Sequence, residues 1–404
     1  MSNLDEVLRE AMIAHRAGKL EAALAGYSSV LSQRPSDARA LHFLGLLLFH
    51  QGEIESGIEH VSRSLQHEPS NARAWNALGG MFMSVARRAE ARQAYLRSTQ
   101  VASNVAEGWY NLAICLRDEG DVDGAEAHLR EAIRRQPSYF VAYEALAMLL
   151  YQLGRTAEAA ILYNDWAARD PSNAKAQHMA AAASGLNVPA RAPDEYVQEL
   201  FDEAAHRFDA NVEQLEYRAH LAVTQALITR VSSARQLLPA VLDAGCGTGL
   251  CGPPVRAHCR HLVGVDLSTR MLDQARERYC YDELIAAEIT AFMRSRPGAF
   301  DAVISADTLV YFGALEEPLS AAFDALTVGG CLAFTLEALE GETLVSDAPV
   351  DHRLEVHGRY AHREGYVRAS LEVAGFVIES LSHETLRRER DRDVRGYLVL
   401  ARRR

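Results

Sequence analysis

A glycine-rich turn in the second half of the chain stands between two carboxylates. The residues that define it are Asp243, Gly245, Gly247, Gly249 and Asp266. Glycine at alternate positions removes the Cβ atoms from a strand-to-helix turn, so that a ligand can lie directly against the backbone. A carboxylate at the end of the following strand can accept hydrogen bonds from both ribose hydroxyls of an adenosine. This spacing predicts a nucleoside-containing cofactor, with Asp266 bound to its ribose.

These glycines fit two kinds of binding turn. The run 247–252 also satisfies the G-x-G-x-x-G pattern of dinucleotide-binding turns. However, Pro253 and Pro254 lie early in the next helix, which weakens the case for a long helix whose N-terminus holds a pyrophosphate. With Asp243 two residues before the first glycine, the turn reads D-x-G-x-G-x-G. It therefore resembles the first motif of class I S-adenosylmethionine-dependent methyltransferases, which implies S-adenosylmethionine as cofactor and S-adenosylhomocysteine as product.

The elements that must position this turn alternate between strand-like and helical runs. Strands are expected at 240–244, 261–265, 284–287, 300–306, 331–336, 376–381 and 396–401. Helices are expected to begin near Ser268, which can cap its helix, and near Glu316 and Tyr366. The alternation predicts a parallel sheet with helices on both faces and a ligand at the C-terminal ends of the strands. The last two strands resemble the antiparallel hairpin of methyltransferases, which implies a Rossmann-like domain with a seven-stranded, mostly parallel sheet.

The methyltransferase resemblance also assigns cofactor contacts beyond the glycine turn. In that family an acid and the following amide at the end of the third strand recognise adenine, a role that falls to Glu288 and Ile289. Leu267, next to the expected ribose carboxylate, and Asp307, at the end of the fourth strand, complete the expected cofactor site.

The first half of the chain repeats itself every 34 residues. The interval is kept by four prolines and one serine, Pro35, Pro69, Ser103, Pro137 and Pro171. Each unit reads as two helices joined by a tight turn, with a small residue on each helix that lets the pair approach. The pattern resembles the tetratricopeptide repeat and implies an α-solenoid with a concave groove. Its five units would span 4–37, 38–71, 72–105, 106–139 and 140–173.

In the geometry of that repeat family, the first helix of each unit lines the groove. The residues expected to contact a partner there are Phe49, Met83, Tyr110, Arg117, Met148 and Tyr151. Tetratricopeptide domains that hold chaperone C-terminal carboxylates use paired Lys and Asn, and the absence of lysine here argues against that use. We expect the groove to bind an extended or helical segment of a partner protein or of this chain. A rigid spacer without a specific partner is the alternative.

The connector 174–220 extends the resemblance over nearly the whole chain. It is similar to the connector of a bacterial family of predicted methyltransferases that carry N-terminal tetratricopeptide repeats. The matching pairs include Tyr196-Val197, Phe201-Asp202, Phe208-Asp209 and Tyr217-Arg218. In related methyltransferases such a helix covers the cofactor, which implies that Tyr217 and Arg218 contact its methionine part. Ala204 and His220 depart from the family pattern, which would place an aromatic residue and a proline there.

Methyl transfer from a sulfonium is an in-line displacement, so alignment and exclusion of water matter more than a catalytic base. An alcohol or ammonium acceptor would nevertheless need a group that takes its proton. We expect His362 or Tyr311 to handle this proton and Arg359 to hold an anionic acceptor.

Composition limits the classes of partner. The 404 residues suffice for two or three folded domains, and the net charge of −12 argues against nucleic acid. The first residues carry no leader-like run and no window approaches 18 apolar residues, so we expect no membrane segment and a cytoplasmic location. The six cysteines lack metal-binding spacings, and we expect no metal. All but two of the 42 cationic residues are arginine, which favours a bacterial source.

These features predict three domains: repeats at 1–173, a helical connector and cofactor lid at 174–220, and a class I methyltransferase domain at 221–404. The first hypothesis is an S-adenosylmethionine-dependent enzyme that methylates an O or N atom of a protein or peptide recruited by the groove. The second is a small-molecule methyltransferase whose repeats serve oligomerisation or scaffolding. The third is an interaction protein that binds S-adenosylmethionine without turnover.

Overall fold

The computed structural model describes residues 3–234, 237–340, 350–389 and 392–404. Contacts between residues divide the chain into two compact units, Met1–Arg169 and Asp170–Arg404. Each unit has its own hydrophobic core. The connector 174–220 belongs to the second unit.

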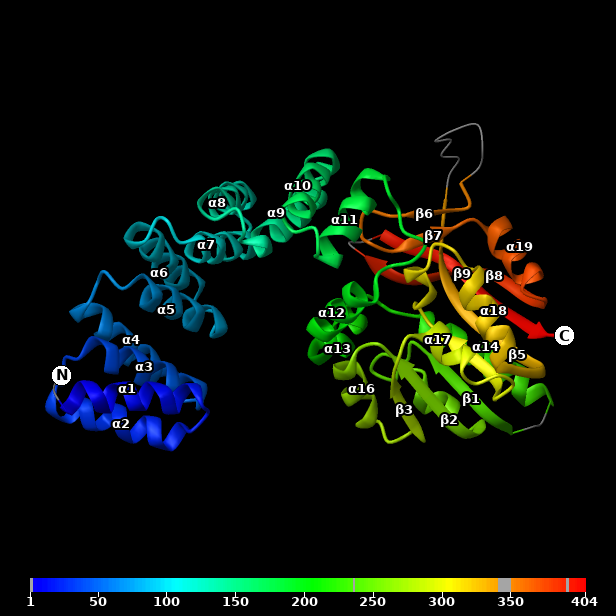
Figure 1. Cartoon of the computed structure of the whole chain (residues 1–404), viewed down its shortest axis with the longest axis horizontal. Helices are drawn as coiled ribbons and strands as arrows, with labels where there is room; N and C mark the ends of the chain where they lie inside the picture. Colours follow the sequence, from blue (N-terminus) through cyan, green and yellow to red (C-terminus); the bar gives the residue numbers. More distant parts are fainter. Residues whose placement is uncertain (1–2, 235–236, 341–349, 390–391) are drawn as a thin grey trace. The chain divides into compact units, whose positions relative to one another are not determined.

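The first unit is a stack of helices that pair in sequence order (Figure 1). Its helices are α1 (Asn3–Arg16), α2 (Leu20–Gln33), α3 (Ala38–His50), α4 (Ile54–His67), α5 (Ala72–Ser84), α6 (Arg88–Val101), α7 (Ala106–Asp118), α8 (Val122–Arg135), α9 (Phe140–Gln152) and α10 (Thr156–Arg169). Each pair contacts the next, which confirms the predicted α-solenoid. The odd-numbered helices α1, α3, α5 and α7 also contact one another in succession, so they line the inner side of the stack.

The small residues of the repeat allow close approach between paired helices. A Cβ atom added to Gly79 in α5 would lie 2.5 Å from the ring of Tyr95 in α6, closer than packing permits. The turns repeat as well, because the residue between the helices of each pair has a positive φ. These turn residues are Gly18, Gly52, Ala86, Gly120 and Gly154. Ala86, with φ of 59°, is the one of the five that carries a Cβ atom.

We predict that Ala86→Gly stabilises the first unit. A Cβ atom disfavours the left-handed region by about 1 kcal/mol, whereas glycine adopts it freely. Ala127→Gly, at an exposed position within α8, is the matched control and should destabilise by about 1 kcal/mol. The chain's three tryptophans, Trp75, Trp109 and Trp166, all lie in this unit, so their fluorescence during urea unfolding reports on it. A lower unfolding midpoint for Ala86→Gly would contradict this account of the turn.

A mostly parallel sheet forms the centre of the second unit (Figure 1). Its strands are β1 (Leu238–Ala244), β2 (Cys259–Asp266), β3 (Glu283–Ala286), β4 (Phe300–Ser305), β5 (Leu326–Ala338), β6 (His352–Leu354), β7 (Tyr360–His362), β8 (Phe376–Glu389) and β9 (Arg392–Arg403). Strands β3-β2-β1-β4-β5 run parallel in this order. Strand β9 continues the sheet antiparallel to β5, and β8 pairs antiparallel with β9. The predicted parallel sheet with a C-terminal antiparallel hairpin is confirmed.

Two features of the sheet differ from the prediction. The described part of the chain contains nine strands rather than seven, because β6 and β7 form a short antiparallel pair and β7 adds to the C-terminal end of β5. The final hairpin is also longer, since the polar segment 382–395 that was expected to separate two strands is mostly strand itself. Leu386 and Arg387 in this segment are buried, at 0% and 5% exposure. This part of β8 therefore packs against the protein instead of forming a solvated loop.

Helices cover both faces of the sheet. They are α11 (Ala174–Ser184), α12 (Asp194–Ala204), η1 (Ala205–Arg207), α13 (Phe208–Gln214), α14 (Ala219–Ala234), α15 (Gly252–Arg256), α16 (Thr269–Arg276), α17 (Ile289–Arg294), η2 (Leu309–Tyr311), α18 (Glu316–Ala325) and α19 (Glu364–Val373). Apolar residues of α17, α18 and α19 share one core, and those of α14 and α15 share the other. Ser268 caps α16 as predicted, accepting a hydrogen bond from the Met271 amide at 3.1 Å. Among the helices described, none combines the length and apolar character that a membrane span requires.

Candidate functional site

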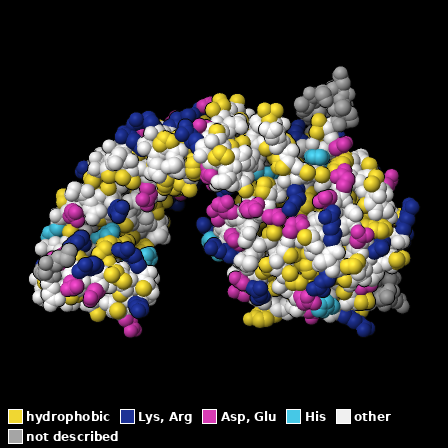
Figure 2. Space-filling model, viewed as in Figure 1, with side chains coloured by type: hydrophobic (Ala, Val, Ile, Leu, Met, Phe, Trp, Pro, Cys, Tyr) yellow, Lys and Arg dark blue, Asp and Glu magenta, His cyan; other side chains and the backbone are white. Residues whose placement is uncertain are grey.

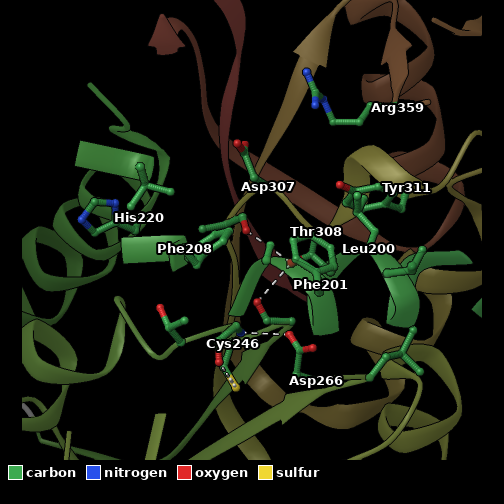
Figure 3. Close-up of a pocket in the computed structure, with 18 of the residues that line it drawn as sticks. Leu200, Phe201, Phe208, His220, Cys246, Asp266, Asp307, Thr308, Tyr311 and Arg359 are labelled. Carbon is green, nitrogen blue, oxygen red and sulfur yellow. Dashed lines mark hydrogen bonds between the residues drawn. The ribbon is translucent and has the colours of Figure 1, made fainter. Parts of the chain in front are cut away.

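The C-terminal ends of the parallel strands border a cavity of about 430 Å³ (Figure 3). Its wall combines the glycine turn after β1, the ends of β2 and β4, the connector helices and the end of β8. Eight of the predicted cofactor residues line it: Tyr217, Gly245, Gly247, Asp266, Leu267, Glu288, Ile289 and Asp307. Arg218, Asp243 and Gly249 do not contribute to the lining.

The glycine turn has the backbone geometry that its sequence predicted. Gly245, Gly247 and Gly249 all have positive φ, of 78°, 54° and 82°. A Cβ atom at Gly245 would lie 2.1 Å from the Thr308 hydroxyl oxygen, whereas a Cβ atom at Gly247 would meet no atom within 4 Å. Because Gly247 lines the cavity, a side chain there would occupy ligand space. The turn is thus closed on its inner side and open on the cavity side.

The carboxylate of Asp266 is fixed at the edge of this turn. Its Oδ2 accepts a hydrogen bond from the Gly247 amide at 2.9 Å, and its Oδ1 accepts one from the Ser268 amide at 2.9 Å. Burial raises the pKa of Asp266, while these backbone hydrogen bonds lower it. Carboxylate oxygens have further lone pairs, so Asp266 can still accept hydrogen bonds from hydroxyl groups of a ligand.

Asp243 lies beneath the turn rather than on the cavity wall. It is buried, at 1% exposure, and its Oδ2 accepts a hydrogen bond from the Tyr281 hydroxyl at 2.6 Å. Its Oδ1 has no partner among the described residues. Burial raises the pKa of Asp243 to about 7, although the Tyr281 hydrogen bond works against this rise. Direct contact of Asp243 with a cofactor stays a prediction, and its described contacts support the turn.

Glu288 combines a structural role with its place on the cavity wall. Its two carboxylate oxygens accept hydrogen bonds from the Thr290 and Ala291 amides, at 2.9 and 2.8 Å, and so cap α17. Arg191, from the connector, lies 3.6 Å from the same carboxylate. The carboxylate therefore faces the cavity in a fixed orientation, and recognition of adenine by Glu288 and Ile289 stays a prediction.

The connector closes the cavity through its two Phe-Asp pairs. Phe201 and Phe208 line the cavity with their rings, and Phe201 also lies edge-on to Tyr311, with centroids 5.6 Å apart. The adjoining carboxylates bind the opposite wall: Asp202 accepts a hydrogen bond from the Ser268 hydroxyl at 2.6 Å. Asp209 accepts one from the Thr248 hydroxyl at 2.6 Å and pairs with Arg278. Each pair thus supplies an apolar lid surface and a polar anchor.

Backbone hydrogen bonds tie both ends of the connector to the sheet domain. At one end, the Ala192 amide donates to the Tyr311 carbonyl and the Gly313 amide to the Ala190 carbonyl, both at 2.8 Å. At the other, the Arg218 amide donates to the Leu386 carbonyl and the Arg388 amide to the Leu215 carbonyl, both at 2.7 Å. These bonds hold the connector across the cavity at both ends.

The pair Tyr217-Arg218 is split by this arrangement. The Tyr217 side chain lines the cavity, and burial raises the pKa of its phenol well above the usual value. The Arg218 side chain is exposed instead and lies 3.5 Å from Glu216. The structure therefore does not place Arg218 where it could contact a ligand in the cavity. Ala204 and His220 both line the cavity, and the His220 ring stacks on Tyr217 with centroids 5.1 Å apart.

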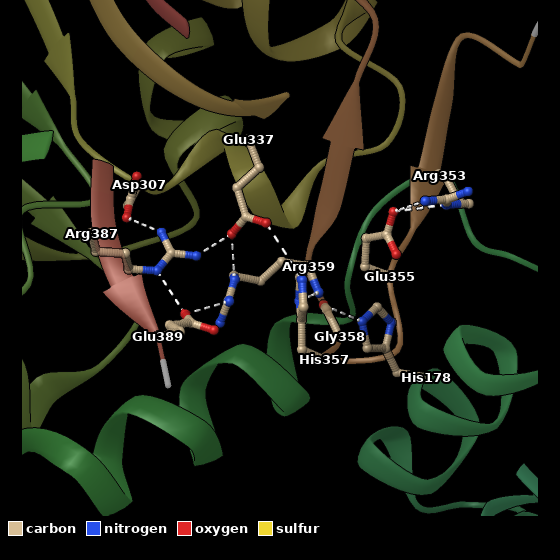
Figure 4. A network of polar contacts seen from close by, with 10 residues as sticks. All are labelled: His178, Asp307, Glu337, Arg353, Glu355, His357, Gly358, Arg359, Arg387 and Glu389. Atoms are coloured by element: carbon tan, nitrogen blue, oxygen red, sulfur yellow. Dashed lines mark hydrogen bonds and ion pairs between the residues drawn. The ribbon is translucent and has the colours of Figure 1, made fainter. Parts of the chain in front are cut away.

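A network of buried charges forms the wall beside β8 (Figure 4). Arg387 is 5% exposed and donates hydrogen bonds to Asp307 and Glu389, both at 2.7 Å, and to Glu337. Arg359 donates to Glu337 at 2.6 Å and to Glu389 at 2.7 Å. Burial alone would raise the pKa of Glu337, but Arg359 and Arg387 outweigh it and lower this pKa to about 2. Sequence reasoning missed Glu337, Arg387 and Glu389, because they lie on segments that carried no recognisable motif.

The three predicted acceptor-side residues have different surroundings. Tyr311 lines the cavity, and burial raises the pKa of its phenol to about 12. Arg359 also lines the cavity, but two of its nitrogens already bind carboxylates. His362 is fully buried outside the lining, with Nε2 3.1 Å from the Gly313 carbonyl oxygen, and burial lowers its pKa to about 4. This placement corrects the expectation for His362, because its ring cannot reach an acceptor in the cavity.

The residues predicted to bind a partner all lie on the odd-numbered helices of the first unit. Phe49 is on α3, Met83 on α5, Tyr110 and Arg117 on α7, and Met148 and Tyr151 on α9. Met148 is 49% exposed. A polar ladder connects two of these helices, since the Asn111 amide donates to Asn76 and the Asn76 amide donates to Glu107, both at 2.9 Å. Contact of these residues with a partner stays a prediction.

We predict that Glu337→Gln destabilises the second unit. Removing this charge leaves two buried guanidiniums with too little compensation, which costs about 3–5 kcal/mol. Hydrogen exchange measured by mass spectrometry should show faster exchange in β5 and β8. Glu372→Gln, at an exposed position of α19, is the control and should leave exchange unchanged. Equal protection in both variants would show that the network contributes little.

The contribution of Glu337 to the stability of the second unit depends on pH. Its pKa is about 2 in the folded protein, below the value of about 4.3 expected for an unfolded chain. Its contribution to the free energy of unfolding is therefore present above pH 4.3 and is lost as the pH falls toward 2. The difference in stability between the native protein and Glu337→Gln should shrink over this range.

Family models match parts of both units. A family model described as a methyltransferase domain matches residues 241–330. A tetratricopeptide repeat model matches residues 8–66, 82–140 and 110–174. A crystal structure of MamA protein is 20% identical, covers 43% of this chain and 94% of its own, and has a TM-score of 0.38.

Two curated relatives illustrate the range of methyltransferases that the second unit resembles. The 18S rRNA (guanine-N(7))-methyltransferase of Bos taurus is 42% identical over 65 residues, which cover 16% of this chain and 23% of that protein. The malonyl-[acyl-carrier protein] O-methyltransferase of Salmonella typhimurium is 32% identical over 124 residues, which cover 30% of this chain and 48% of that protein. The chain thus spans less than half the length of these relatives.

The names of the relatives do not agree on an acceptor, since one is an rRNA methyltransferase and the other modifies a malonyl carrier protein. The expected absence of a nucleic-acid partner therefore stays a prediction. What the matches and the fold agree on is the type of each unit. The first unit carries tetratricopeptide repeats, and the second unit contains a methyltransferase domain built on a mostly parallel sheet.

Proposed function

We propose that the protein uses S-adenosylmethionine to methylate an acceptor on a protein or peptide that the repeat groove recruits. The observation that carries the cofactor assignment is the glycine turn, which is closed toward Thr308 and open toward the cavity at Gly247. Asp266 stands at its edge with lone pairs left for two hydroxyl groups. The open backbone at Gly247 and the carboxylate of Asp266 fit the adenosine part of this cofactor.

When bound, S-adenosylmethionine would supply an electrophilic methyl group on a sulfonium. The protein's part is to hold the acceptor in line and to exclude water. Phe201 and Phe208 present apolar surface over the cavity, while Asp202 and Asp209 keep the connector in place. Tyr311 lies on the cavity wall, where its hydroxyl can position the acceptor as a hydrogen-bond donor.

The repeats support a macromolecular acceptor. An inner helix face with exposed Met148 and the half-buried Tyr110 and Tyr151 can bury apolar side chains of an extended segment. Joining such a groove to a transferase raises the effective concentration of a bound segment at the cavity. The alternative of a small-molecule methyltransferase, with repeats for oligomerisation, predicts that groove substitutions leave turnover unchanged. An interaction protein that binds the cofactor without turnover predicts no methylated product.

The cofactor assignment is tested by calorimetry with S-adenosylmethionine. Asp266→Ala should weaken binding at least tenfold, because it removes the carboxylate from the turn. Asp273→Ala, on the exposed side of α16, is the control and should bind as the native protein does. Circular dichroism checks that both variants are folded. Native affinity in a folded Asp266→Ala variant would overturn the assignment.

The role of the groove is tested by a pair of charge substitutions. Met148→Glu should raise the KM for a protein acceptor several-fold without changing the affinity for S-adenosylmethionine. Ile161→Glu, at a position of α10 that is 67% exposed, is the control. The assay follows labelled methyl groups transferred into proteins of a cell extract and, separately, into extractable small molecules. Label confined to small molecules and indifferent to Met148→Glu would favour the second hypothesis.

A further inference from the structure

The cavity carries an excess of negative charge on the side chains that line it. Among the described lining residues the carboxylates are Asp194, Asp266, Glu288, Asp307 and Glu389. The guanidiniums are Arg191, Arg359 and Arg387. Five negative and three positive groups leave a net charge of −2, and Glu337 behind the wall adds another negative charge. A cofactor with a net charge of +1 would leave this excess only partly balanced.

Part of the excess lies at the end of the cavity away from the glycine turn. Figure 3 shows Asp307, Tyr311 and Arg359 on the side opposite Asp266. There, two guanidiniums face three carboxylates. His357 adds no charge at neutral pH, because burial and Arg359 lower its pKa to about 4. The acceptor side therefore carries a net negative charge of its own.

Glu389 is the carboxylate best placed to meet an acceptor. Its Oε1 accepts hydrogen bonds from both Arg359 and Arg387, at 2.7 Å each, which fixes the group on the cavity wall (Figure 4). Its Oε2 has no hydrogen-bond partner among the residues that the structure describes, and the side chain keeps 33% of its surface exposed. Burial would raise the pKa of Glu389, but the two arginines lower it, so the group is ionised. Arg359, by contrast, is already engaged by carboxylates.

We propose that the methyl acceptor is a positively charged nitrogen group and that Glu389 is its counter-ion in the cavity. This inference rests on the proposed function and replaces the expectation that Arg359 holds an anionic acceptor. A carboxylate acceptor would add negative charge to a wall that already has an excess, whereas an ammonium or guanidinium would balance it.

Methyl transfer to an ammonium or guanidinium group conserves atoms and charge. The bound ammonium or guanidinium first gives its proton to Asp307, which lines the cavity and whose pKa burial raises. The nitrogen lone pair then forms the N–C bond while the C–S bond breaks and its electron pair goes to sulfur. The products are a methylated nitrogen that carries the positive charge and a neutral thioether. No further reactant is needed.

The outer surface around the cavity has the same sign. The connector helices α12 and α13 carry exposed acids, Glu195, Glu199, Glu203, Asp209 and Glu213. Figure 2 shows acidic side chains gathered over these helices. A basic segment would be attracted to this surface before its acceptor group enters the cavity. A cationic acceptor, inferred from the charge of the cavity wall, therefore also fits the acidic outer surface of α12 and α13.

The test uses the full chain, a methyl-labelled donor and defined acceptors. Peptide pools have Lys, Arg or His fixed at the centre, and matched pools have Asp, Glu or Ser there, while spermidine serves as a free amine. We expect alkali-stable label in the basic pools. Glu389→Gln should lower kcat/KM for them at least tenfold through KM, and Glu384→Gln, elsewhere on β8, should not. Without donor, Glu389→Gln should also weaken equilibrium binding of the labelled peptides.

The other possible results of this assay bear on different parts of the proposal. Label released as methanol by alkali from the acidic pools would overturn the charge inference and leave methyl transfer to peptides standing. Label in spermidine alone would uphold a cationic acceptor and overturn recruitment of peptides. If the donor binds and no pool is labelled, both the proposed function and this inference fail. Equal binding of basic peptides to the native protein and Glu389→Gln would remove Glu389 as the counter-ion.

Discussion

The second unit depends on compensation of the buried Arg387 guanidinium. Its three donor groups bind Asp307 after the end of β4, Glu337 of β5 and Glu389 of β8, so one side chain joins the central strands to the terminal hairpin. Burying an isolated charge would cost several kcal/mol, and the cost is offset only when its partners are all in place. The buried Leu386 is next to Arg387 in the chain, and Arg387 and Glu389 form part of the wall of the cavity.

The connector illustrates how covering and anchoring are combined in neighbouring residues. Phenyl rings of Phe201 and Phe208 close the cavity, and the next residue in each case binds a polar group on the opposite wall. Because Ser268 both caps α16 and donates to Asp202, the lid is tied to the same element that fixes Asp266. A change in the position of the connector would therefore act on the residue that fixes the Asp266 carboxylate.

Sequence reasoning succeeded where local chemistry determines structure. The 34-residue period, the glycine turn and the Ser268 cap each express a short-range rule, and the structure has all three. Sequence reasoning did not find Glu337, Arg387 and Glu389. Contact between these side chains depends on the register between β5, β9 and β8, which no local pattern encodes. For the same reason the sequence did not reveal that His362 is buried, in β7 between its partner strand β6 and the carbonyl of Gly313. The extra pair of strands escaped because each is only three residues long.

The uniform helix-pair units of the first half have an evolutionary consequence. Each pair contacts mainly its neighbours, so a whole 34-residue unit can be duplicated, lost or exchanged without disturbing a distant core. The second unit offers no such freedom, because its buried charges must all be present at once. Selection can therefore change the first unit by whole repeats while the second unit stays constant.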